Sequence, residues 1–263
     1  MLINLPKPNI KSKNLTVMKL LWAGPAAILI LSFAPHATSF TPISSTTIST
    51  AATVHARTTV SLADSARFDL LYEDLDLQGL ALSKEAFHKA VLGFLTLQMN
   101  GTIQNPDVLS IIDFSLPSTQ KRLFVIDMLN GRLLFNTFVA HGRNSGGLMA
   151  TRFSNRTNSF MSSLGFYLTG DAFFGQHGYS LRLQGIERGW NDHAFARRII
   201  MHPAGYVSEE HIQQWGFLGR SEGCPAIPEE LDGAIIDEIK GGSCLFLYAP
   251  SYGRNRRPAT VLS

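Results

Sequence analysis

The sequence predicts a mostly-β domain of the α+β class, preceded by a short helical region. Three observations lead to this prediction. Short apolar runs rich in β-branched and aromatic residues recur between residues 109 and 248. One connection between two of these runs contains Asn130-Gly131, a strong signal for a β-hairpin. The clearest helical periodicity, over residues 83–99, comes before all of these runs.

Composition supports a globular domain and excludes some functions. The chain has 263 residues, of which 45% are hydrophobic and 16% are charged. Such a mixture is typical of a folded domain and not of a disordered chain. The formal net charge is +3. Four of the 23 positive residues lie in the first 19 positions: Lys7, Lys11, Lys13 and Lys19. The remainder is therefore close to neutral, and we do not expect a nucleic-acid-binding protein.

The first 37 residues have the order of a secretory signal peptide. A basic stretch precedes an apolar run, and small residues suited to cleavage follow at Ala34 and Ala37. An uncleaved membrane anchor is the alternative, and it would be the only contact with a membrane. The apolar run has about 15 residues, fewer than the roughly 20 that a spanning helix needs. We therefore expect cleavage and export to the periplasm or cell envelope.

The rest of the chain divides into four segments. Residues 38–61 are rich in Ser, Thr and Ala and predict a flexible linker. Residues 62–105 predict a helical region, in which Ser83 caps the helix 83–99 and Asn100-Gly101 ends it. Residues 106–253 predict the mostly-β domain, and residues 254–263 a tail.

This mostly-β domain contains seven predicted strands and three short predicted helices. The strands are residues 111–114, 123–127, 133–140, 166–169, 180–183, 199–201 and 244–248. The helices are residues 192–197, 208–215 and 228–240.

The residues that carry chemistry lie between positions 199 and 228. His202 ends an apolar strand, where a side chain is held rigidly and can still face a cleft. Ser221-Glu222-Gly223-Cys224 follows, 22 positions separating the histidine from the cysteine. A cysteine needs a nearby imidazole to take its proton. Gly223 permits a tight turn, in which the Gly223 and Cys224 N–H groups can face a developing oxyanion. We therefore predict a Cys224 nucleophile with His202 as its base.

This arrangement resembles the L,D-transpeptidase catalytic domain family, in its branch with Ser-x-Gly-Cys-Pro. The resemblance covers residues 109–252. It also rests on Phe124-Val125-Ile126-Asp127, Ala140-His141-Gly142, His177-Gly178-Tyr179-Ser180-Leu181, Asn191-Asp192-His193-Ala194 and Gly219-Arg220-Ser221. It implies a β-sandwich-like domain with the cysteine and the histidine in a cleft, and a substrate among peptidoglycan stem peptides.

The resemblance also implies a reaction. Cys224 attacks the carbonyl between the third stem residue and the terminal D-alanine, and D-alanine leaves. An amine of a neighbouring stem then accepts the acyl group, which forms a 3-3 crosslink. If water is the acceptor, the same site is an L,D-carboxypeptidase. A thiolate, an imidazole and backbone donors suffice, so no cofactor is implied.

Two departures from the wider family concern the motif. Many members have an arginine two places after the cysteine, where this chain has Pro225-Ala226, and a glycine after the histidine, where it has Pro203. Arg220 could supply the missing positive charge to a stem carboxylate. Ser221 could orient His202, and otherwise is a turn residue.

Other interpretations of the same residues remain open. In an exported protein, Cys224 and Cys244 could form a disulfide, which would remove the nucleophile. His141 and His177 could shape the cleft or have purely structural hydrogen bonds. No His or Cys pair has the spacing of a zinc site, so we expect no metal. The protein could also be a non-catalytic peptidoglycan-binding module. A papain-type protease is disfavoured, because the cysteine follows the histidine. The sequence does not indicate the oligomeric state.

Overall fold

The computed structural model describes residues 62–253, which lie within one compact unit, His55–Ser263. The predicted leader 1–37, linker 38–61 and tail 254–263 lie outside the described residues. Within residues 62–253, no helix has both the length and the apolar character needed to cross a membrane.

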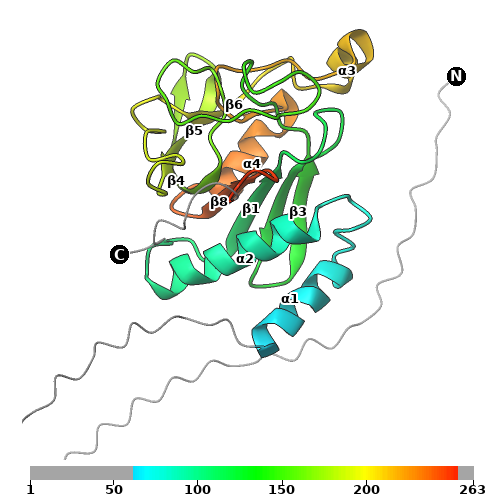
Figure 1. Cartoon of the computed structure of the whole chain (residues 1–263), viewed down its shortest axis with the longest axis vertical. Coiled ribbons are helices and arrows are strands. Elements are labelled where there is room, and N and C mark those ends of the chain that lie inside the picture. The colour runs from blue at the N-terminus through cyan, green and yellow to red at the C-terminus, as the bar shows by residue number, and fades with distance from the viewer. Residues whose placement is uncertain (1–61, 254–263) are drawn as a thin grey trace, which may run out of the picture. The chain divides into compact units, whose positions relative to one another are not determined.

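The helices and strands follow one another in the order shown in Figure 1. They are α1 (Leu62–Asp74), α2 (Lys84–Met99), β1 (Val108–Asp113), β2 (Leu123–Asp127), β3 (Arg132–Thr137), β4 (Gly165–Gly175), β5 (Gly178–Gly185), β6 (Ile200–Pro203), α3 (Glu209–Trp215), β7 (Ala226–Ile227), the 3-10 helix η1 (Glu229–Leu231), α4 (Asp232–Ile239) and β8 (Cys244–Tyr248). The predicted mostly-β class with a few short helices is confirmed.

The eight strands form one sheet in the order β3-β2-β1-β8-β4-β5-β6-β7. The pairs β1–β8 and β6–β7 are parallel, and the other neighbours are antiparallel. The Asn130-Gly131 hairpin joins β2 to β3 as predicted, with Gly131 at a φ of 62°. Glycine has no Cβ to clash there, so it tolerates the left-handed turn.

The central strands are buried on both faces of the sheet. Every residue of β1, β2 and β8 is buried, because successive side chains of a strand point to opposite faces and both faces are covered. Helix α2 covers one face with Phe87, Val91 and Phe94, against Ile111 among others. Helix α4 covers the other face with the run that includes Ile235 and Ile236. The N-terminal helical region therefore shares a hydrophobic core with the catalytic sheet.

Helix α2 begins as the sequence predicted. The Ala86 N–H donates to the Ser83 hydroxyl at 3.0 Å, which satisfies one free donor of the first turn. The Ser83 N–H in turn donates to the Asp113 carboxylate at 3.1 Å, at the end of β1. This second bond joins the start of the helix to the sheet that it covers.

The predicted helix over residues 192–197 is wrong. This segment is a series of turns. The Asp192 carboxylate accepts from the Gly189 N–H at 2.7 Å, and the Asn191 side-chain Oδ1 accepts from the Glu187 N–H at 2.9 Å. Both side chains therefore bond to residues that precede them. Asp and Asn side chains that bond the local backbone in this way compete with helix formation.

The other two short helices lie where they were predicted, with changes at their ends. Helix α3 begins at Glu209 after the Ser208 cap, whose hydroxyl accepts from the His211 N–H. The segment predicted as residues 228–240 divides into η1 and α4. Strands β6 and β7 lie at one edge of the sheet, and His202 lies in β6.

Candidate active site

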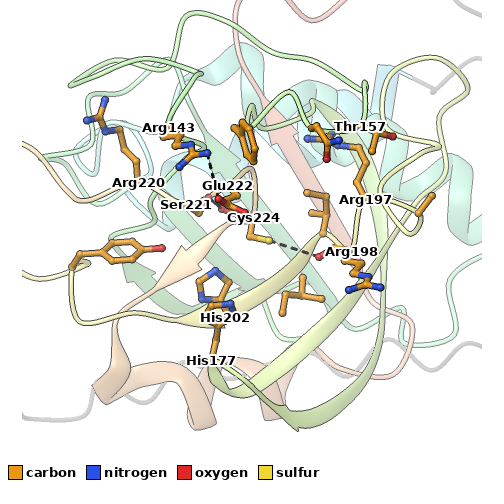
Figure 2. A pocket seen from close by; sticks show the side chains of 16 residues that line it. Arg143, Thr157, His177, Arg197, Arg198, His202, Arg220, Ser221, Glu222 and Cys224 are labelled. Carbon is orange, nitrogen blue, oxygen red and sulfur yellow. Dashed lines mark hydrogen bonds and ion pairs between the residues drawn. The ribbon is translucent and has the colours of Figure 1, made fainter.

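A cleft of about 730 Å³ lies at the β6–β7 edge of the sheet. Both residues of the predicted catalytic pair, His202 and Cys224, line it. Figure 2 shows the imidazole and the thiol on the same side of this cleft, with His177 beyond the imidazole. Its remaining wall comes from the loop that precedes β6, from Tyr206, and from the segment around Phe160.

Strand pairing brings His202 close to the cysteine turn. His202 lies in β6 and pairs with Ala226 of β7, two residues after Cys224. The His202 N–H also donates to the Pro225 carbonyl at 3.4 Å. The position of the imidazole relative to the turn is therefore set by the backbone of two paired strands, which a loop would hold less rigidly.

A side-chain bond sets the proton arrangement of the His202 ring. Nδ1 lies 2.9 Å from the Pro203 carbonyl oxygen. A carbonyl oxygen can only accept, so Nδ1 carries the proton and donates it. In the neutral ring, Nε2 is then the unprotonated nitrogen. This is the tautomer that a base for the thiol requires.

The turn that presents Cys224 is closed by Ser221. The Ser221 hydroxyl accepts from the Gly223 N–H at 3.0 Å and donates to the Cys224 carbonyl at 2.6 Å. Ser221 thus bonds the turn and has no bond to His202. The Cys224 N–H bonds no other residue of the described range 62–253. The role of Gly223 as an oxyanion donor stays a prediction, and it requires the Ser221 hydroxyl to release that N–H.

The turn fits closely against a second segment. Gly223 has a φ of 126°, and a Cβ there would lie 2.7 Å from the Met161 carbonyl oxygen. A Cβ on Gly142 would lie 2.9 Å from the Gly223 Cα. The two backbones meet where Gly142 bridges to Ser221. Glycine at both positions allows this approach, which no residue with a side chain would permit without displacement.

The disulfide alternative does not occur. Cys224 and Cys244 are both free, the first half-buried in the cleft and the second fully buried in β8. Cys244 packs in the core beneath α2, as a small apolar side chain. The Cys224 thiol instead lies 3.9 Å from the Arg198 carbonyl oxygen, the dashed contact in Figure 2.

The sequence profile of the L,D-transpeptidase catalytic domain family matches residues 79–248. That match covers more than half of the chain. This protein belongs to the L,D-transpeptidase catalytic domain family. The matched range begins before α2, so the family domain includes this helix as well as the sheet and the cleft. No curated protein matches the sequence significantly.

Several solved structures are similar to parts of this chain, at low sequence identity and low TM-score. An L,D-transpeptidase from Mycobacterium smegmatis is 13% identical, with a TM-score of 0.34, over 54% of this chain and 59% of that one. One from Stackebrandtia nassauensis is 11% identical, with a TM-score of 0.33, over 72% and 80%. The helical cell shape determining protein Pgp2 from Campylobacter jejuni is 12% identical, with a TM-score of 0.36, over 63% and 56%. This chain thus spans 59% of the length of the first of these.

Burial moves the pKa values of the two central groups of this L,D-transpeptidase domain apart. Burial raises the pKa of Cys224, against the Ile200 N–H and the positive charge of Arg197, which lower it. Burial also lowers the pKa of His202, helped by His177 and opposed by the bond to the Pro203 carbonyl. Both groups are therefore neutral at neutral pH.

His177 lies in the cleft, as one of the two predictions for it required. It occupies the turn between β4 and β5 and is exposed. Its ring stacks on the His202 ring with 4.6 Å between centroids and 29° between planes. Stacking of this kind restricts the rotation of the His202 ring and adds a group whose charge lowers the pKa of His202.

His141 has a structural position outside the cleft. It is buried, and its Nδ1 accepts from the Arg122 guanidinium at 2.8 Å, because an arginine can only donate. Burial and the charge of Arg122 lower the pKa of His141 to about 4. Its carbonyl oxygen accepts from the Ser221 N–H at 3.0 Å. His141 thus supports the cysteine turn through the backbone.

Arg220 lines the cleft as expected, but its side chain is already engaged. It donates to the Gly146 carbonyl at 3.1 Å and stacks over the Phe217 ring at 5.3 Å. The two family positions that differ in this chain have backbone roles. Ala226, two places after Cys224, pairs with His202 in the sheet and its carbonyl accepts the Ala140 N–H at 2.8 Å, and the Pro203 carbonyl accepts the His202 Nδ1 proton.

Sequence reasoning missed three further arginines of the cleft. Arg143, Arg197 and Arg198 line the cleft together with Arg220, against a single acidic residue, Glu222. Arg197 and Arg198 come shortly before β6, the strand that carries His202, and this closeness in the sequence was the available signal. Among residues 62–253, no three His, Cys, Asp or Glu side chains are grouped so as to hold a metal ion.

Proposed function

We propose that this L,D-transpeptidase domain transfers acyl groups of peptidoglycan stem peptides through Cys224, releasing D-alanine and forming 3-3 crosslinks. The observation that carries the proposal is the shared cleft of a free, half-buried thiol and an imidazole whose Nδ1 proton is held by the Pro203 carbonyl. A pure binding module needs neither feature. The predicted leader places the reaction in the periplasm or cell envelope.

The acylation half begins with two neutral groups. As the Cys224 sulfur attacks the stem carbonyl carbon, His202 Nε2 takes the thiol proton. The charge that develops on sulfur is favoured by the Ile200 N–H and by Arg197, the groups that oppose the effect of burial on its pKa. The oxyanion accepts from the Cys224 N–H, which has no other described partner.

Collapse of the tetrahedral intermediate breaks the carbon–nitrogen bond. His202 returns its proton to the leaving D-alanine amine, and a thioester remains on Cys224. In the second half, an acceptor amine attacks the thioester and His202 takes the proton that this nitrogen loses. The sulfur then leaves and recovers a proton. Water in place of the amine would make the reaction an L,D-carboxypeptidase reaction.

Incubation of the purified protein with tetrapeptide stems tests the proposal. Mass analysis of the intact protein is expected to show a thioester adduct, and analysis of the products is expected to show free D-alanine and either a crosslinked or a trimmed stem. Cys224→Ala is expected to abolish the adduct, whereas the matched variant Cys244→Ala is expected to keep it, because Cys244 is buried in β8. An adduct that persists in Cys224→Ala would assign the reaction to another nucleophile.

A further inference from the structure

The cleft carries an excess of positive charge. Four arginines and one glutamate line it. Glu222 is paired with Arg143, whose Nη2 lies 3.4 Å from the Glu222 carboxylate. A cleft with this balance of charge attracts an anionic ligand, and arginine binds carboxylates through two parallel hydrogen bonds.

Three of the four arginines are already engaged by the protein. Arg143 stacks over the Phe160 ring at 4.0 Å, in addition to its pair with Glu222. Arg220 donates to the Gly146 carbonyl. Arg197 donates four hydrogen bonds to the segment that includes Ser154 and Met161, the shortest of them 2.6 Å to the Met161 carbonyl. These bonds hold the walls of the cleft.

Arg198 differs from the other three. Its side chain is exposed, and its guanidinium has no hydrogen bond or ion pair with any described residue, 62–253. Its backbone is nevertheless the part of the wall that lies against the nucleophile, because the Arg198 carbonyl oxygen is 3.9 Å from the Cys224 sulfur. Figure 2 shows the Arg198 side chain across the cleft from His202.

The backbone of Arg198 is also unusual. Its φ is 56°, in the left-handed region that glycine and asparagine occupy more readily than arginine. Backbone preference therefore does not account for an arginine at this position. The residue lies between the main cleft and an adjoining groove of about 610 Å³, and it lines both.

We propose that Arg198 is a specificity-determining residue that binds the C-terminal carboxylate of the D-alanine that leaves. In a tetrapeptide stem this carboxylate lies one residue beyond the attacked carbonyl. Arg198 lines the cleft next to the attacking sulfur, since its carbonyl oxygen is 3.9 Å from Cys224 Sγ. The guanidinium then aligns the scissile bond and selects stems that end after the fourth residue. This inference rests on the proposed function, which supplies the identity of the substrate.

Binding without turnover tests the inference. The full chain carrying Cys224→Ala is titrated by calorimetry with a synthetic tetrapeptide stem and with the same peptide as its C-terminal carboxamide. Loss of a hydrogen-bonded ion pair is expected to weaken binding of the carboxamide about 10- to 100-fold. Adding Arg198→Gln is expected to weaken the free acid to the level of the carboxamide, with no further effect of amidation. Equal discrimination with and without Arg198→Gln would overturn the inference.

Three controls sharpen this comparison. Arg188→Gln removes an exposed arginine that does not line the cleft, so the two peptides should still differ as in the parent. Arg198→Lys keeps the charge without the planar fork and is expected to recover part of the discrimination. In a stem whose third residue carries a side-chain carboxylate, amidation of that group should change the affinity by the same factor with and without Arg198→Gln. If Arg198→Gln instead weakens the unmodified stem but has no effect on this side-chain amide, the arginine binds the other carboxylate and the inference is overturned.

Acylation by the unmodified full chain separates this inference from the proposed function. An acyl-enzyme with the tetrapeptide, together with binding that ignores amidation, would support the reaction and overturn the role of Arg198. Discrimination that depends on Arg198, without any acyl-enzyme or D-alanine release, would support the carboxylate site and overturn the reaction. Absence of binding by either peptide to the Cys224→Ala chain would overturn the role of Arg198.

Discussion

Protonation of His141 is expected to destabilise this domain in mild acid. Only 1% of the residue is exposed, and its Nδ1 accepts a hydrogen bond from the buried Arg122 guanidinium at 2.8 Å. A second proton on the ring would replace that acceptor with a donor facing a cation. Burial, together with the charge of Arg122, therefore lowers the pKa of His141 to about 4.

The size of the effect follows from the two pKa values. An unfolded histidine has a pKa of about 6.5, and each unit of difference is worth about 1.4 kcal/mol. Between pH 6.5 and 4 the unfolded chain binds a proton at position 141 that the folded chain does not bind. The free energy of unfolding is therefore expected to fall with falling pH, by about 3 kcal/mol across this window. Above about pH 6.5 this contribution does not change with pH.

Urea unfolding at several pH values between 7 and 4 measures this loss. His141→Gln cannot titrate, and its amide oxygen can still accept from Arg122. The wild type is expected to lose about 3 kcal/mol more than this variant over the window. His193→Gln, at an exposed position, is the matched control and should follow the wild type. Parallel curves for the wild type and His141→Gln would refute the argument, since the other histidines are common to both.

Three further predictions concern the cleft. His177→Phe keeps a stacking ring but removes a group that lowers the pKa of His202. The acid limb of the pH profile of the acylation rate should therefore move to higher pH, toward the pKa of an ordinary histidine. An acid limb at the same pH in both proteins would contradict this. In Gly223→Ala the new Cβ meets a backbone carbonyl, and the residue has a positive φ that strains alanine. The free energy of unfolding in urea should fall by about 1–3 kcal/mol, and the acyl-enzyme should no longer form. The control Gly233→Ala lies in open space within α4 and should have neither effect. Ser221→Ala leaves the buried Gly223 N–H without its acceptor. The free energy of unfolding is expected to fall by about 1–3 kcal/mol, and acylation is expected to be slower. Unchanged stability would mean that other contacts hold the turn.

Much of the fold was accessible from local sequence patterns. The helix α2, its Ser83 cap and the hairpin at Asn130-Gly131 each depend on a few neighbouring residues, and each lies where it was predicted. The predicted helix over residues 192–197 was wrong for a complementary reason. Asn191 and Asp192 bond to earlier residues of the same loop, and periodicity carries no information about such bonds.

The candidate site divides in the same way. The motif itself predicted Cys224 and His202 as the reactive pair, because a reactive cysteine needs a base and a tight turn. His202 ends a predicted strand, and Cys224 directly follows Gly223, which permits such a turn. The roles of the residues around them came from long-range contacts. Ser221 bonds the turn and not the imidazole, and His141 supports the turn from the core.

The sequence by itself determined the class of fold and the family, and it predicted Cys224 and His202 as the reactive pair, since these depend on the order and chemistry of nearby side chains. The tertiary structure decided which groups face the thiol. Pairing of β6 with β7 places His202 beside the cysteine turn, and the chain that precedes β6 brings the Arg198 carbonyl to the sulfur from 26 positions away. These contacts join residues that are far apart in the sequence, so they depend on strand pairing and loop packing, and no local sequence pattern encodes them.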